Sequence, residues 1–181
     1  MILESEEQTM TLKNIQELNK EIFLIIRDIV GIKNVGVAFG RDFYTYYAQK
    51  KVVYSIIKAD LTDKEFNECA KKNFNYMPKD SIDSFAISLL HELGHIETMK
   101  TFNKISIALD DIKKSIIQTF IDSDFDKKRI IAKTYYSLPT EYTATKWAVD
   151  WIRKHPNKYK IMLKRIEKAL NDFYKINNIE G

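Results

Sequence analysis

Apolar residues recur at three- and four-residue spacing along most of the chain, which predicts a mainly helical protein. From Thr11 to Val30 they form one stripe that stops at Gly31, so we expect an N-terminal helix within residues 1–32. A second short helix is expected from Thr62 toward Lys72. The same spacing predicts further helices within residues 80–100, 105–120, 127–135, 138–155 and 156–181.

The pattern changes between the first helix and the others. Residues 33–60 hold three clusters of β-branched and aromatic residues, namely Val35–Phe39, Phe43–Tyr47 and Val52–Lys58. We predict that they form a small three-stranded antiparallel sheet. Only 5 Gly and 3 Pro are present, too few for the turns of an all-β fold. The predicted class is α+β, predominantly helical, in a single domain over residues 1–181.

Composition narrows the range of functions. The formal net charge of +4 is too small to indicate nucleic-acid binding, although the basic helix 156–181 leaves an acidic partner or nucleic acid open. No segment approaches the roughly 20 apolar residues of a membrane span, and residues 1–7 lack the pattern of a secretory signal. The single cysteine, Cys69, fits a reducing compartment. We therefore expect a cytoplasmic protein.

The residues that point to chemistry are His91-Glu92-Leu93-Gly94-His95, inside the helix predicted at 80–100. Four residues advance a helix by about one turn, so both imidazoles project from one face and can share one ion. Imidazole nitrogens suit Zn²⁺, and Glu92 can take a proton from a water on that ion. The alternative is a pair of ordinary core or surface histidines. Because the chain has only 3 histidines, we favour a zinc hydrolase with Glu92 as general base.

Gly94 adds a structural expectation to this motif. Glycine inside a helix costs about 1 kcal/mol relative to alanine. This cost is easiest to explain if another backbone crosses close to that face of the helix, although packing alone would also explain it.

A catalytic zinc needs three protein ligands, so the two histidines leave the site one ligand short. The better candidate is Glu141, near the start of the helix predicted at 138–155, where the helix dipole by itself also favours an acid. Glu97 follows His95 by two residues and points to a different side of the helix. His155 is expected at a helix end.

Two segments together resemble a known family. Phe85-Ala86-Ile87-Ser88-Leu89-Leu90-His91-Glu92-Leu93-Gly94-His95 and the later Glu141-x-x-Ala144-x-x-Trp147-Ala148 are similar to the motifs of ImmA/IrrE-type gluzincin metallopeptidases. The resemblance covers roughly residues 35 to 150. It implies a zincin-like fold with a helix and a small antiparallel sheet before the active-site helix. It also implies zinc bound by His91, His95 and Glu141, with Glu92 as general base.

Two features depart from the family pattern. Thr145 stands where the family has Asn, and its hydroxyl could still orient a ligand, but with less reach. Residues 96–140 make a longer gap than the family has, with an additional helix within residues 103–122. That helix could cover the cleft or only add to the core, and we favour the core.

The expected function is that of a zinc metallopeptidase. If the resemblance extends to function, the substrate is a regulatory protein such as a DNA-binding repressor. A peptide would pair with the strand Val52–Lys58 at a sheet edge, and Tyr135, Tyr136 or Tyr142 would stabilise the oxyanion. The alternatives are a zincin-fold binding or regulatory module with an idle or structural metal site, and hydrolysis of a non-peptide amide.

Overall fold

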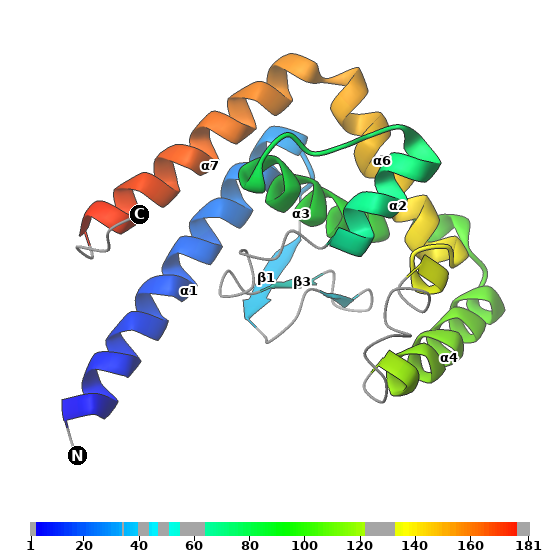
Figure 1. The fold of residues 1–181 in the computed structure, drawn as a ribbon, viewed down its shortest axis with the longest axis horizontal. Coiled ribbons are helices and arrows are strands. Elements are labelled where there is room, and N and C mark those ends of the chain that lie inside the picture. The colour runs from blue at the N-terminus through cyan, green and yellow to red at the C-terminus, as the bar shows by residue number, and fades with distance from the viewer. Residues whose placement is uncertain are drawn as a thin grey trace. The chain divides into compact units, whose positions relative to one another are not determined.

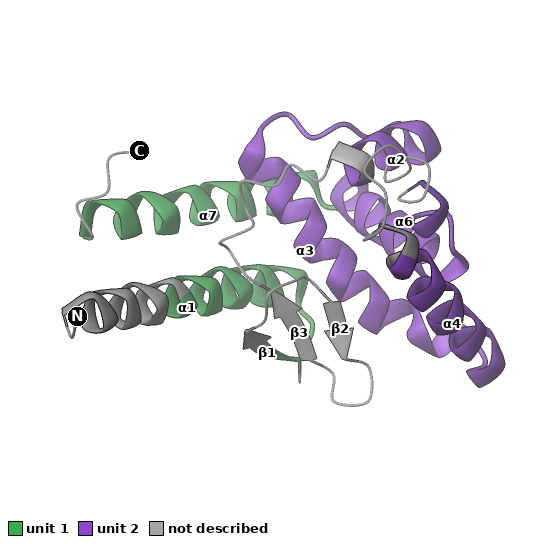
Figure 2. Ribbon diagram, turned by 60° about the horizontal axis from the view of Figure 1, so that its bottom comes forward, with its two compact units in different colours: residues 1–60, 155–181 green, residues 61–154 purple. Residues whose placement is uncertain are grey.

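A computed structural model describes residues 3–33, 35–39, 44–46, 51–54, 64–121 and 133–176. They belong to two compact units, residues 1–60 with 155–181, and residues 61–154 (Figure 2). Most of the described residues are helical. No described helix combines the length and the apolar character that a membrane span requires. The expectation of a single domain over residues 1–181 stays a prediction.

Two long helices form the main part of the first unit. Helix α1 (Leu3–Val30) packs against α7 (Pro156–Ile176), and the two lie side by side (Figure 1). Gly31 ends α1 with φ at 85°, and its N–H donates to the carbonyl of Arg27 at 2.9 Å. The predicted helix and its end are confirmed, although α1 begins before Thr11. The buried residues of the two helices include Leu18, Ile22, Ile25, Ile26, Tyr159, Met162, Ile166 and Ala169.

The sheet of this unit differs from the prediction. Its strands are β1 (Gly36–Phe39), β2 (Tyr44–Tyr46) and β3 (Lys51–Tyr54), in the order β1-β3-β2. Val52 of β3 lies opposite Val37 in a parallel pair and opposite Thr45 in an antiparallel pair. The predicted three-stranded antiparallel sheet is therefore wrong, because β1 and β3 run in the same direction.

The proposed sheet edge is wrong for a related reason. Strand β3 has a neighbour on each side, and Val52 and Val53 pair with residues of both β1 and β2, so this part of the strand cannot receive an added peptide strand. Residues 55–58, the rest of the predicted Val52–Lys58 strand, lie outside the described residues. The short connection between β2 and β3 explains their antiparallel pairing, whereas nothing in the strand pattern places β1 on the far side of β3.

The second unit is built on two tightly packed helices. It contains α2 (Lys64–Phe74), α3 (Ser81–Thr98), the 3₁₀ turn η2 (Met99–Thr101), α4 (Lys104–Ile121) and α6 (Pro139–Lys154). Helix α3 packs along α6. The side chain of Asp80 accepts a hydrogen bond from the N–H of Asp83 at 2.8 Å, which caps the start of α3. The buried residues of the two helices include Ala86, Ile87, Leu90, Leu93, Ala144 and Ala148.

The crossing of α3 and α6 occurs at Gly94. A Cβ built on Gly94 would lie 2.6 Å from the backbone oxygen of Ala144 and 3.1 Å from its Cα. This is closer than a side chain allows, so only glycine permits the contact. The expected backbone approach at Gly94 is thereby confirmed. Because His91 and His95 flank this crossing, the first turn of α6 is brought next to both imidazoles.

Helix α4, the additional helix predicted within residues 103–122, turns its polar face inward. Its apolar stripe of Ile105, Leu109, Ile112 and Ile116 is at least 51% exposed at every position. Asp110, on the opposite face, is only 3% exposed. The prediction that this helix adds to the core is therefore wrong for its apolar stripe. The inward face carries charged groups that contact α6.

Candidate metal centre

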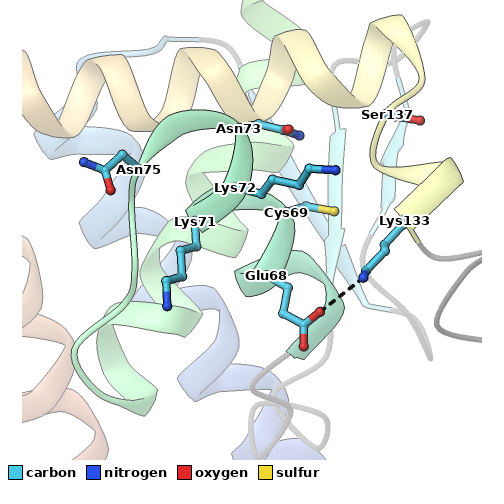
Figure 3. Close-up of a pocket in the computed structure, with 8 residues that line it drawn as sticks. All are labelled: Glu68, Cys69, Lys71, Lys72, Asn73, Asn75, Lys133 and Ser137. Carbon is cyan, nitrogen blue, oxygen red and sulfur yellow. Dashed lines mark ion pairs between the residues drawn. The ribbon is translucent and has the colours of Figure 1, made fainter.

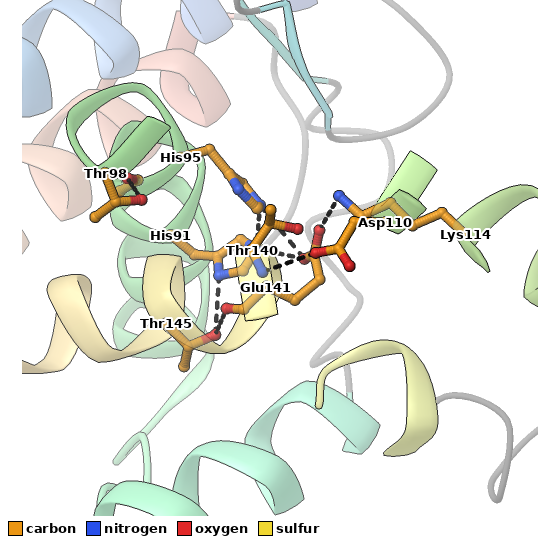
Figure 4. Close-up of polar contacts among 9 residues, drawn as sticks. His91, His95, Thr98, Asp110, Lys114, Thr140, Glu141 and Thr145 are labelled. Atoms are coloured by element: carbon orange, nitrogen blue, oxygen red, sulfur yellow. Dashed lines mark hydrogen bonds and ion pairs between the residues drawn. The ribbon is translucent and has the colours of Figure 1, made fainter. Parts of the chain in front are cut away.

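Three donor atoms from two helices converge in the second unit (Figure 4). The Nε2 atoms of His91 and His95, both on α3, lie 3.0 Å apart. Oε2 of Glu141, in the first turn of α6, lies 3.1 Å from Nε2 of His91 and 3.3 Å from Nε2 of His95. The three side chains that the sequence selected as ligands are thus brought together.

The spacing of these atoms matches a shared metal ion. Two ligands held at about 2.0–2.1 Å from one zinc with tetrahedral angles lie about 3.3 Å apart. The three separations between the two Nε2 atoms and Oε2 of Glu141 range from 3.0 to 3.3 Å. The three donor atoms are therefore spaced as ligands of one zinc ion would be.

The burial and the pKa shifts of the three donor side chains favour a positive charge between them. His91 and His95 are each 5% exposed and Glu141 only 1%. Burial by itself would raise the pKa of Glu141, but the charge of His95 and hydrogen bonds from both imidazoles hold that pKa well below its ordinary value. Burial would lower the pKa of His91, but the hydrogen bond and charge of Glu141, together with the charge of Glu92, raise it. Three lone-pair-bearing atoms so close together require a proton or a metal ion between them.

Thr145 fixes the orientation of one imidazole. Its hydroxyl donates to the backbone oxygen of Glu141, one turn earlier on α6, at 2.9 Å. The hydroxyl oxygen of Thr145, Oγ1, lies 3.0 Å from Nδ1 of His91. Because the hydroxyl proton is donated to the Glu141 carbonyl, Oγ1 accepts the Nδ1–H of His91. This arrangement leaves the Nε2 lone pair of His91 directed at the site. A threonine at the position of the family's asparagine therefore reaches the ligand.

Glu92 is the second acid beside the imidazoles. It is buried, and its carboxylate and the ring nitrogens of His91 and His95 all lie within 4.8 Å of one another. This buried His–Glu–His group could hold a metal ion. Glu92 and Glu141 therefore both lie close enough to take part in the chemistry of one ion.

Of the other acid and base candidates, neither joins the site. Glu97 lies outside the His–Glu–His group and is partly exposed. His155 lies between α6 and α7, where its backbone oxygen accepts the N–H of Tyr159 at 2.9 Å. The expected position of His155 at a helix end is confirmed.

The three candidate tyrosines differ in their surroundings. The ring of Tyr136 packs edge-on against Phe66, which packs in the same way against His91, both with ring centroids 5.4 Å apart. Tyr135 presents its ring 5.8 Å from the ammonium of Lys114. Tyr142 instead packs against Phe74, at the end of α2. The geometry therefore favours Tyr135 and Tyr136 over Tyr142 as neighbours of the site.

Two residues of α4 that the sequence did not single out also reach the site. Lys114 pairs with Oε1 of Glu141 at 2.5 Å, and Asp110 accepts the backbone N–H of Thr140 at 3.0 Å. They are four residues apart, so they share one face of the helix. The four-residue spacing of Asp110 and Lys114 was the signal in the sequence that could have identified them. The apolar stripe on the other face of α4 instead suggested that this polar face points to solvent.

A pocket of about 490 Å³ lies elsewhere in this unit (Figure 3). Its lining includes Lys71, Lys72 and Lys133 but none of the metal-site residues. Lys133 pairs with Glu68 at 3.7 Å. Lys71 and Lys72 occupy the last turn of α2, where cations stabilise the terminal carbonyls. The end of α2 therefore accounts for Lys71 and Lys72, and the ion pair with Glu68 accounts for Lys133.

Comparisons of the chain with family models, curated proteins and solved structures find no match. The metal centre is accordingly inferred from the geometry of the described residues. The resemblance to ImmA/IrrE-type gluzincins stays a prediction that rests on the motif residues.

Proposed function

We propose that the protein is a zinc-dependent metallopeptidase in which His91, His95 and Glu141 hold the metal and Glu92 is the general base. The observation that carries the proposal is the convergence of two Nε2 atoms and one carboxylate oxygen within 3.3 Å of one another in a buried site. The motif spacing on α3 and the carboxylate on α6 support the same assignment.

The donor set favours zinc over other common cations. Two imidazoles and one carboxylate form a typical catalytic zinc site, whereas Ca²⁺ and Mg²⁺ prefer oxygen ligands alone. When bound, zinc supplies a Lewis acid and a water of lowered pKa. The protein contributes the fixed tautomer of His91, set by Thr145, and a second carboxylate to move protons.

Glu92 is suited to the role of base by its place on the helix. Neighbouring residues of a helix point about 100° apart, so Glu92 does not share the direction of His91 and His95. Its carboxylate, within 4.8 Å of both imidazoles, can take a proton from the attacking water and return it to the leaving amine.

The substrate and location are proposed from the sequence. The ImmA/IrrE resemblance supports a regulatory protein, such as a DNA-binding repressor, as the substrate. A cytoplasmic location is supported by the single, buried Cys69.

The first test combines metal content with hydrolysis. We expect the purified full-length protein to bind one zinc per chain by elemental analysis, and to cleave members of a mixed peptide library unless a chelator is present. Zinc without cleavage of any peptide or amide would favour the binding or regulatory module. Cleavage that persists in chelator would contradict the metal mechanism.

Replacing Gly94 with Ala should force α3 and α6 apart and disturb the metal site. The new Cβ would meet backbone atoms of Ala144, which cannot turn aside as a side chain does. We expect the free energy of unfolding to fall by about 1–3 kcal/mol in chemical denaturation. Zinc affinity, measured by chelator competition, should fall by about 10–100-fold, as for other losses of ligand support.

Gly31→Ala is the matched control for this variant. Gly31 has φ at 85°, so alanine is strained there by about 1–2 kcal/mol, but the residue belongs to the first unit. Gly31→Ala should lower stability and leave zinc affinity unchanged. Wild-type zinc affinity in Gly94→Ala would show that the close crossing does not position the ligands.

A further inference from the structure

Lys114 contacts the outer oxygen of the third proposed ligand. Its ammonium lies 2.5 Å from Oε1 of Glu141, while Oε2 of the same carboxylate faces the two imidazoles. Among the described residues, Oε1 is buried and has no hydrogen bond besides this ion pair. The contact with Lys114 therefore holds the carboxylate in the orientation that directs its other oxygen at the histidines.

Asp110 contacts the backbone next to that ligand. Helix α6 begins with Pro139, which has no N–H, and the N–H of Thr140 donates to Oδ2 of Asp110 at 3.0 Å. Asp110 thus acts as a cap supplied by another helix, and its negative charge suits the N-terminus of α6. The first turn of α6, which carries Glu141, is held by α4.

The orientation of α4 is unusual for a helix that only packs. Two ionisable side chains face inward, where burial of charge is costly without a partner, while four aliphatic side chains face outward. Packing alone would favour the reverse orientation. Both inward groups contact α6 within one turn of its start (Figure 4).

We propose that α4 is a positioning element for the metal site, in which Asp110 sets the start of α6 and Lys114 holds Glu141 in the ligand geometry. This inference rests on the proposed zinc site and deepens it, because it assigns residues outside the HExxH motif to metal affinity. Neither residue is a ligand or acts on substrate.

Charge alone predicts the opposite effect for Lys114. A cation near a site for Zn²⁺ repels the metal, so its removal would tighten binding. The contact with Oε1 argues against this outcome, because without Lys114 that buried oxygen has no partner among the described residues and Glu141 can turn away from the imidazoles. The sign of the change in zinc affinity therefore separates positioning from repulsion.

The test measures zinc affinity of the full-length chain by competition with a chelating dye. Lys114→Met should weaken zinc binding by about 10–100-fold, the usual cost of losing a ligand's support. Lys114→Arg, which keeps the charge and the donors, should restore most of that loss. Lys113→Met is the matched control, since Lys113 is the exposed neighbour on the same helix, and should bind zinc like wild type.

Variants of Asp110 provide a second, independent test by the same measurement of zinc affinity. Asp110→Ala should weaken zinc binding, Asp110→Asn should recover part of it, and Asp111→Ala, at an exposed neighbour, should have no effect. Far-UV circular dichroism of each metal-free variant separates loss of ligand positioning from loss of fold. If Lys114→Met and Asp110→Ala are folded and bind zinc as tightly as wild type or more tightly, the positioning role of α4 is wrong. The proposed zinc site itself is not contradicted by that result. Failure of the wild-type chain to bind zinc would overturn the metal site itself.

Discussion

Replacing Glu92 with Gln should leave zinc bound and slow hydrolysis by about 10²–10⁴-fold, the usual contribution of a general base. The substitution keeps the size of the side chain but removes its ability to take a proton. The zinc ligands in this assignment are His91, His95 and Glu141, so metal content should not change. The measurement is the rate of cleavage of a peptide identified by library digestion, together with zinc content by elemental analysis.

Glu97→Gln is the matched control for this prediction. Glu97 lies on the same helix, is partly exposed and takes no part in the His–Glu–His group. Its replacement should change neither zinc content nor rate. A Glu92→Gln protein that cleaves at the wild-type rate would remove Glu92 from the catalytic role.

The motif helix was predictable because its signals are local. The spacing of His91 and His95 follows from helical geometry, and the end of α1 at Gly31 depends on residues within one turn. Gly94 carried information of longer range, since glycine in a helix interior implied a close neighbour. The structure identified that neighbour as Ala144.

The pairing of the strands was less accessible from the sequence. Residues 36–39, 44–46 and 51–54 form strands inside or overlapping the predicted clusters, because β-branched and aromatic residues favour extended backbone. The order β1-β3-β2 depends on contacts between distant segments, which a strand pattern does not encode. Antiparallel pairing of neighbours was the simplest assumption, and it held only for β2 with β3.

The orientation of α4 shows why the surroundings of the site could not be read from periodicity. An amphipathic pattern normally places its apolar face inward. Helix α4 has the opposite orientation, with its polar face inward. On that face Lys114 pairs with Glu141 and Asp110 accepts the N–H of Thr140. These contacts depend on where α6 begins, so the ligands were easier to predict than the residues that support them.

Replacing Glu141 with Ala should lower zinc affinity by more than about 100-fold. Changes to residues that only support a ligand cost about 10–100-fold, so loss of a ligand should cost more. Two imidazoles would remain, and two protein ligands are fewer than a catalytic zinc site uses. Zinc affinity is measured by chelator competition, with His95→Ala as a second ligand variant that should behave alike. Glu97→Ala, at a partly exposed acid outside the site, should bind zinc as wild type does.

Glu141→Ala and Glu92→Gln together assign the two acids of the site. Both carboxylates lie close to His91 and His95: Oε2 of Glu141 is within 3.3 Å of both Nε2 atoms, and the Glu92 carboxylate is within 4.8 Å of a ring nitrogen of each histidine. The geometry therefore predicts zinc loss for Glu141→Ala and zinc retention for Glu92→Gln. Since Glu141→Ala also leaves Lys114 without its ion pair, Glu141→Gln serves as a variant of nearly wild-type shape and should also bind zinc more weakly. If both Glu141 variants keep zinc and Glu92→Gln loses it, the assignment is reversed: Glu92 is the ligand and Glu141 is the base.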